Sequence, residues 1–162
     1  MADTALYERD FYTWTQEQAA FLRELRGHNR LDTDHLAEEI ADLGKAELRA
    51  VRNNLERCFE HLLKLAVSPA DAPKGHWARE TERFADNVRP AYSPGMRQHL
   101  DPAAIWTKAC RAAHLELSDY GEGGLPVTPP CPVTLDAVLH PGFDIDAVVA
   151  RLRDSLGGDE RA

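Results

Sequence analysis

One apolar pattern in the middle of the chain restricts the possible folds more than any other feature. Between residues 48 and 65, apolar side chains recur at alternating steps of three and four residues. This spacing places them on one face of an α-helix and does not fit the two-residue period of a strand. Because such a face must be buried against other helices, the pattern predicts a helical bundle. The residues are Leu48, Val51, Leu55, Cys58, Leu62 and Leu65.

Other segments repeat the helical spacing. The first of them predicts a buried stripe along one helix, formed by Tyr7, Phe11, Trp14, Gln18, Phe21 and Leu25. We expect helices over most of 5–26, 34–66, 77–88, 102–120 and 145–156, and no sheet. Asp101 followed by Pro102 is a strong signal for the start of a helix. Gly44 interrupts the second of these segments, either as a kink in one long helix or as a break between two.

These segments together predict an all-α protein. Each apolar face is one-sided, and short connections make successive helices antiparallel. We therefore expect an antiparallel helical bundle of about four main helices with short peripheral helices. The expected organisation is a bundle domain over residues 1–143, followed by an amphipathic C-terminal helix and tail over 144–162 that packs on the same domain.

Composition excludes some classes of function. A net charge of −8 argues against a nucleic-acid surface, which needs a concentration of Lys and Arg. No apolar run is long enough for a membrane span, and the N-terminus lacks the features of a signal peptide. The three cysteines have no C-x-x-C spacing, which fits reduced thiols and a cytoplasmic location. Cys131, which precedes a proline, is most simply part of a structural turn.

Several short motifs resemble a known bacterial family, catalogued as domain of unknown function twenty-nine. The resemblance runs from Leu6 to about Phe143 and implies a small all-helical protein, with no assigned activity to transfer. This sequence departs from the family pattern in the glycine-rich stretch 119–124 and in the helix after Asp144. The matching residues are Leu6-Tyr7-x-x-Asp10-Phe11-x-x-Trp14, Leu36-x-Glu38-Glu39-Ile40-x-Asp42-Leu43-Gly44-x-x-Glu47, His61-Leu62-Leu63-Lys64, Trp77, and Cys131-Pro132-x-Thr134-Leu135.

Four polar residues fall on or beside the apolar stripes and are therefore the candidate site residues: Gln18, Glu39, Glu47 and His61. A buried carboxylate or imidazole must be hydrogen-bonded, paired or metal-bound. The four residues are thus expected to form either a structural polar network inside the bundle or a small metal or ligand site. The Glu-x-x-His pairs of carboxylate-bridged bundles are absent from the sequence.

The absence of a complete catalytic constellation favours a non-enzymatic function. Our leading hypothesis is a helical protein-interaction or self-associating module, whose partner is another protein or a second copy of the chain. Neither nucleic acid nor membrane is expected as a partner. The alternative is a metal- or small-ligand-binding enzyme with its site inside the bundle. Whether the chain is an enzyme stays open, and the sequence identifies no cofactor.

Overall fold

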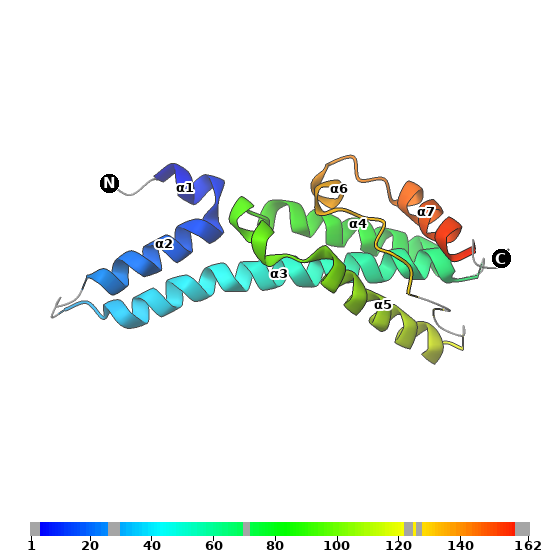
Figure 1. The fold of residues 1–162 in the computed structure, drawn as a ribbon, viewed down its shortest axis with the longest axis horizontal. Helices are drawn as coiled ribbons and strands as arrows, with labels where there is room; N and C mark the ends of the chain where they lie inside the picture. The colour runs from blue at the N-terminus through cyan, green and yellow to red at the C-terminus, as the bar shows by residue number, and fades with distance from the viewer. Residues whose placement is uncertain (1–3, 26–29, 70–71, 122–124, 126–127, 158–162) are drawn as a thin grey trace. The chain divides into compact units, whose positions relative to one another are not determined.

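The computed structural model describes residues 4–25, 30–69, 72–121, 125 and 128–157. Within these residues the protein has seven α-helices, one 3₁₀ helix and no strand, so the all-α prediction is confirmed (Figure 1). None of the described helices is long and apolar enough to span a bilayer. The elements are α1 (Thr4–Arg9), α2 (Phe11–Glu24), α3 (Thr33–Val67), α4 (Lys74–Ala91), the 3₁₀ helix η1 (Pro94–His99), α5 (Pro102–Asp119), α6 (Leu135–Leu139) and α7 (Ile145–Gly157).

The chain divides into two compact units. The first unit comprises Met1–Val51 and Ala91–Leu100, and the second comprises Arg52–Pro90 and Asp101–Ala162. The division therefore falls inside α3, whereas the boundary predicted at residue 143 lies within the second unit. Helix α7 belongs to that unit, where Arg153 donates a hydrogen bond to the carbonyl oxygen of Leu65 at 2.9 Å.

The first predicted helix is two helices, because Asp10 interrupts it. Asp10 has non-helical dihedral angles and accepts a hydrogen bond from the backbone N–H of Thr13, at 3.1 Å, so it caps α2. Its second carboxylate oxygen accepts a hydrogen bond from the backbone N–H of Gly95 at 2.8 Å. One side chain thus starts α2 and holds η1 against it, a tertiary role that helical periodicity does not reveal.

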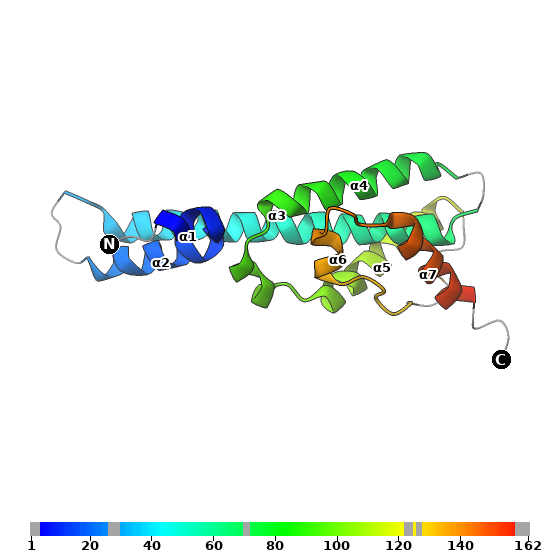
Figure 2. The ribbon, with the colours of Figure 1, turned by 90° about the horizontal axis from the view of Figure 1, so that it is seen from above.

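Gly44 does not break the segment into two helices, since α3 runs through it from Thr33 to Val67. In the first unit α2 and α3 form an antiparallel hairpin, with Ala19 buried against Ala37 and Ala41 (Figures 1 and 2). At Gly44 the two helices come so close that a Cβ there would overlap the Thr15 hydroxyl and lie 3.2 Å from the Thr15 Cβ. The glycine therefore permits close packing.

This close contact yields a first prediction. We expect Gly44→Ala to destabilise the protein by about 1–3 kcal/mol, because the added methyl overpacks the hairpin and displaces the Thr15 hydroxyl from the Tyr12 carbonyl oxygen. Denaturant unfolding gives the free energy. Gly75→Ala is the matched control, since the nearest atom to a Cβ there is 3.6 Å away on the Arg79 side chain. Equal stability of the two variants would contradict the prediction.

The second unit buries the apolar stripe that the sequence predicts for the C-terminal half of α3. Every residue from Cys58 to Leu65 is buried, because other helices of this unit surround this part of α3 (Figure 2). Helix α5 begins as predicted, with the Asp101 side chain accepting hydrogen bonds from the backbone N–H groups of Ala103 and Ala104. A helix that is buried all round leaves no solvent-facing side for its polar residues. Those residues form the candidate site.

Candidate functional sites

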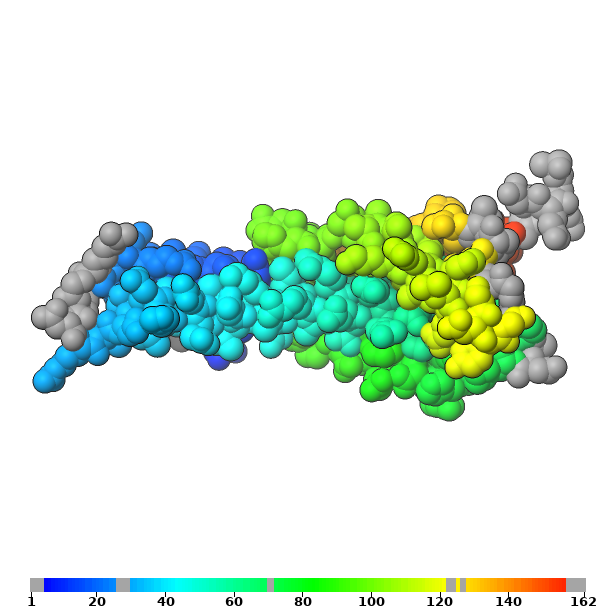
Figure 3. Space-filling view, turned by 90° about the horizontal axis from the view of Figure 1, so that it is seen from below, coloured from blue at the N-terminus to red at the C-terminus, as the bar shows by residue number. Residues whose placement is uncertain are grey.

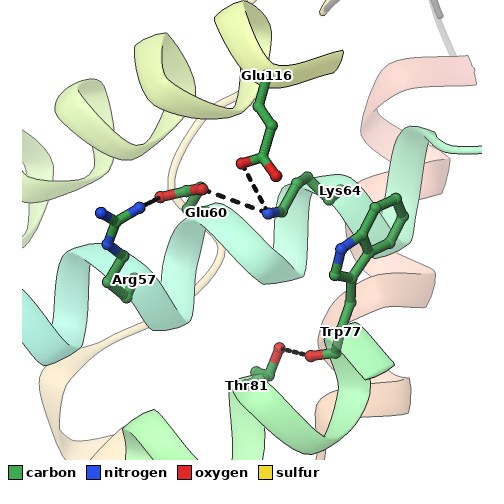
Figure 4. Close-up of polar contacts among 6 residues, drawn as sticks. All are labelled: Arg57, Glu60, Lys64, Trp77, Thr81 and Glu116. Atoms are coloured by element: carbon green, nitrogen blue, oxygen red, sulfur yellow. Dashed lines mark hydrogen bonds and ion pairs between the residues drawn. The ribbon is translucent and has the colours of Figure 1, made fainter. Parts of the chain in front are cut away.

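A chain of alternating charges lies in the second unit, on α3 and α5. Glu60 and Lys64 are one helical turn apart, and their side chains are each only 2% exposed. The Lys64 ammonium donates hydrogen bonds to Glu60 at 3.3 Å and to Glu116 of α5 at 2.9 Å. Arg57 donates a hydrogen bond to the other Glu60 oxygen at 2.8 Å (Figure 4). Buried charges persist only when paired in this way.

An aromatic ring completes the surroundings of Lys64. The ammonium nitrogen lies 5.4 Å from the centroid of the Trp77 ring of α4, within the range of a cation–π interaction. The backbone carbonyl of Trp77 accepts a hydrogen bond from the Thr81 hydroxyl at 2.8 Å (Figure 4). Three helices therefore converge on one lysine.

The two glutamates of this cluster differ in acidity. Burial, together with the nearby Glu116 carboxyl, raises the pKa of Glu60. Burial also acts to raise the pKa of Glu116, but the neighbouring Glu60 carboxyl, the hydrogen bond from Lys64 and the lysine charge outweigh it, so the pKa of Glu116 is lowered. At neutral pH, Glu116 is accordingly the firmly ionised partner of Lys64.

Beside the cluster lies a cavity of about 250 Å³. Its lining combines titratable and aromatic side chains, including His61, Lys64, His76, Trp77, Glu116 and Tyr120. A larger hollow of about 500 Å³ lies near Arg79 and Asp144, but it is a wide-open depression. The smaller cavity is the candidate ligand site, because it alone of the two reaches a buried charge.

His61 lines this cavity and has one unpaired polar atom, its buried Nδ1. The residue is 9% exposed, and its ring stacks on Phe84 with centroids 5.5 Å apart. Among the described residues nothing hydrogen-bonds to the buried Nδ1 atom. Burial, assisted by the Lys64 charge, lowers the pKa of His61 to about 4. The imidazole is therefore neutral at physiological pH.

The four residues singled out in the sequence do not converge. The prediction of an interior position is correct for His61 and wrong for Glu39 and Glu47, which are exposed on the part of α3 in the first unit. There the buried side of α3 passes through Ala37 and Ala41 and not through Leu36 and Leu43, so the glutamates face solvent. Gln18 of α2 is partly exposed.

Sequence reasoning missed Glu60, Lys64 and Glu116. The sequence does contain a signal for Glu60 and Lys64. These two residues are spaced i, i+4 within the segment 58–65, whose apolar residues cover more than one face of the helix. No local signal identifies Glu116, which is brought to Lys64 by the packing of α5.

Other chemistry finds little support in the described residues. There, no three or more His, Cys, Asp or Glu side chains gather as metal ligands would. Burial raises the pKa of the Cys58 thiol to about 12 and that of Cys110 to about 11, so both behave as core residues. Burial also raises the pKa of Cys131, whose thiol donates a hydrogen bond to the Val133 carbonyl oxygen at 3.2 Å.

A second candidate site is an exposed apolar face on the first unit. The stripe predicted to be buried along the first helix is not buried, because α2 packs through Tyr12, Thr15 and Ala19 instead. Three of its residues are exposed and three are partly exposed: Tyr7, Phe21 and Leu25, and Phe11, Trp14 and Gln18, respectively. Phe21 and Leu43 are each 55% exposed. Of the eight exposed large hydrophobic side chains among the described residues, six belong to this unit: Tyr7, Phe21, Leu25, Leu31, Leu36 and Leu43.

We call the exposed apolar side chains of the α2–α3 hairpin the apolar face, since they lie outside the contact between the two helices. Successive helical residues are rotated by about 100°. On α3 the line through Leu36 and Leu43 is therefore about 100° from the buried line through Ala37 and Ala41. On α2, Phe21 comes two positions after the buried Ala19 and is therefore about 160° round the helix from it. The two helices lie side by side (Figure 3), so Leu36 and Leu43 border their contact, whereas Phe21 points largely away from α3.

Carboxylates border the apolar face. Glu39 and Glu47 stand four residues to either side of Leu43, and Glu17 and Glu24 flank Phe21 at helical spacing. The basic residues Lys45 and Arg23, two positions after Leu43 and Phe21, project about 160° away from them, while the exposed Arg30 adjoins Leu31. The face is thus apolar with an acidic border.

Comparison with known proteins agrees with an all-α helical protein. The family model for Domain of unknown function DUF29 matches residues 6–144, and the chain belongs to this family. Among solved structures, the chain is similar to an alpha-helical protein of unknown function from Rhodospirillum rubrum, with 30% sequence identity and a TM-score of 0.78. The match covers 90% of this chain and 96% of that one. No curated protein matches the sequence.

Proposed function

We propose that this chain is a non-enzymatic protein-interaction module whose first unit binds an amphipathic helix of another protein. The observation that carries the proposal is the concentration of exposed Phe and Leu side chains on the α2–α3 hairpin of the first unit. Contiguous exposed apolar patches on proteins commonly mark interaction sites. Exposed apolar side chains on a helical hairpin can pack against the apolar stripe of a third helix.

The acidic border selects the partner. A second copy of the chain would bring Glu39 and Glu47 against the same carboxylates, and like charges oppose association. A helix with Lys or Arg beside its apolar stripe would instead meet opposite charges. The proposed partner is therefore a basic amphipathic helix.

Two model peptides test this proposal by calorimetry. Both have leucine on one helix face, and the other face carries lysine in the first peptide and glutamate in the second. We expect the lysine peptide to bind at least tenfold more tightly, a difference of about 1.4 kcal/mol. Glu39→Lys with Glu47→Lys should reverse the preference, and Phe21→Ser with Leu43→Ser should abolish binding of both peptides.

Leu115→Ser is the matched control, because Leu115 is equally exposed but lies on α5 in the second unit. This variant should bind the lysine peptide as the wild type does. Sedimentation equilibrium of the free protein provides the other arm. A dimer that Phe21→Ser with Leu43→Ser dissociates would replace the proposal by self-association, and equal affinity for both peptides would refute the role of the acidic border.

We also propose that the protein acts in the cytoplasm. Cys58, Cys110 and Cys131 are all free thiols, and two of them are buried core residues. A reducing compartment suits such a set of cysteines.

A further inference from the structure

The cavity beside Lys64 presents charges of both signs at one point. Lys64 and Glu116 are hydrogen-bonded to each other at 2.9 Å, and both line the cavity. Together with Arg57 and Glu60, the cluster has two positive and two negative groups. A ligand with a single net charge would leave this partly buried cluster unbalanced, which is costly. A ligand with its own ammonium and carboxylate would keep the balance.

The two members of the pair differ in their freedom to move. The Lys64 side chain is 2% exposed and held within α3, whereas the Glu116 side chain is 36% exposed. Outward rotation of Glu116 would let a ligand carboxylate accept a hydrogen bond from the Lys64 ammonium while the ligand ammonium donates to Glu116. The neutral His61 side chain also lines the cavity, with its Nδ1 atom buried and inaccessible.

Apart from Pro73, the remaining walls are aromatic. The Trp77 ring and the exposed Tyr120 ring both border the cavity, and so does the His76 imidazole. At about 250 Å³ the cavity is smaller than the roughly 300–1,000 Å³ typical of drug-sized ligands. Its size and lining suit a compact molecule with one apolar ring.

From this arrangement we propose that the cavity binds a free amino acid with an aromatic side chain. The ligand carboxylate pairs with Lys64, its ammonium pairs with Glu116, and its ring packs against Trp77 and Tyr120. This site lies in the second unit and does not depend on the apolar face of the first. Failure of one proposal therefore leaves the other standing.

Three probes that share a phenyl ring separate the charge requirements: L-phenylalanine, phenylacetate and 2-phenylethylamine. Titration calorimetry on the full chain should show L-phenylalanine binding at least tenfold more tightly than either singly charged probe. In Glu116→Gln the cluster gains one net positive charge. L-phenylalanine should then lose at least tenfold in affinity, while phenylacetate binds more tightly than it does to the wild type.

Glu82→Gln removes the same charge from an exposed position of α4 outside the cavity and should leave all three affinities unchanged. Tyr120→Ala, at a residue 70% exposed, tests the aromatic wall without altering the charges, and should weaken L-phenylalanine. The proposal is overturned if L-phenylalanine does not bind at millimolar concentration, if a singly charged probe binds more tightly to the wild type, or if Glu116→Gln leaves the L-phenylalanine affinity unchanged.

Discussion

Replacing Lys64 by methionine should lower the free energy of unfolding by about 3 kcal/mol. The substitution keeps the length of the side chain but leaves the buried Glu60 without its lysine partner, and losing one partner of a buried ion pair costs about 3–5 kcal/mol. We expect the lower end of this range, because Arg57 still pairs with Glu60. Urea unfolding followed by circular dichroism measures the change.

A second variant and a control make this prediction specific. Lys64→Met combined with Glu60→Met should recover most of the lost stability, since Arg57 is largely exposed and returns to solvent when Glu60 is removed. Lys45→Met makes the same substitution on the same helix, in an exposed pair with Asp42, and should change stability by less than about 1 kcal/mol. Equal losses for Lys64→Met and Lys45→Met would show that burial of the pair has no energetic consequence.

The sequence predicts the helices better than it predicts their buried faces. The stripe Leu48 to Leu65 is buried as expected, because the helix face that its apolar spacing predicts is also the face that packs against other helices. On α2 the same kind of spacing marks the exposed side, while the buried side holds the small Thr15 and Ala19. Periodicity locates the apolar face of a helix, but a close helix pair can form through small residues instead.

The residues of the candidate ligand site also differ in how far the sequence predicts them. His61 was predictable because it is adjacent to the apolar stripe of α3. Lys64 and Glu60 lie off that stripe, where a two-helix contact would leave them in solvent, and only full enclosure of α3 buries them. Glu116 reaches the site from 52 residues away, a pairing that local spacing does not encode. The exposed Glu39 and Glu47 show the converse case, in which the assumed buried face was the wrong one.

His61 should make the stability of the protein depend on pH in the mildly acidic range. Its pKa is about 4 in the folded protein, against an ordinary value of 6.5. Above pH 6.5 neither state binds the proton, so His61 has no effect on the pH dependence. As the pH falls from 6.5 to 4, the unfolded chain takes up the proton and the folded protein does not, so the folded state is progressively destabilised.

The expected size of this effect is about 3 kcal/mol, from about 1.4 kcal/mol per pKa unit. His61→Phe retains an aromatic ring against Phe84 and removes the titration. The stability of the wild type relative to this variant should therefore fall by about 3 kcal/mol between pH 7.5 and pH 4. The contributions of carboxyl groups such as Glu60 to the pH dependence of stability largely cancel in this comparison, because both proteins contain these groups. A parallel pH dependence of the two proteins, or an NMR titration of the native His61 ring with its midpoint near 6.5, would show that the imidazole is hydrated in the folded state.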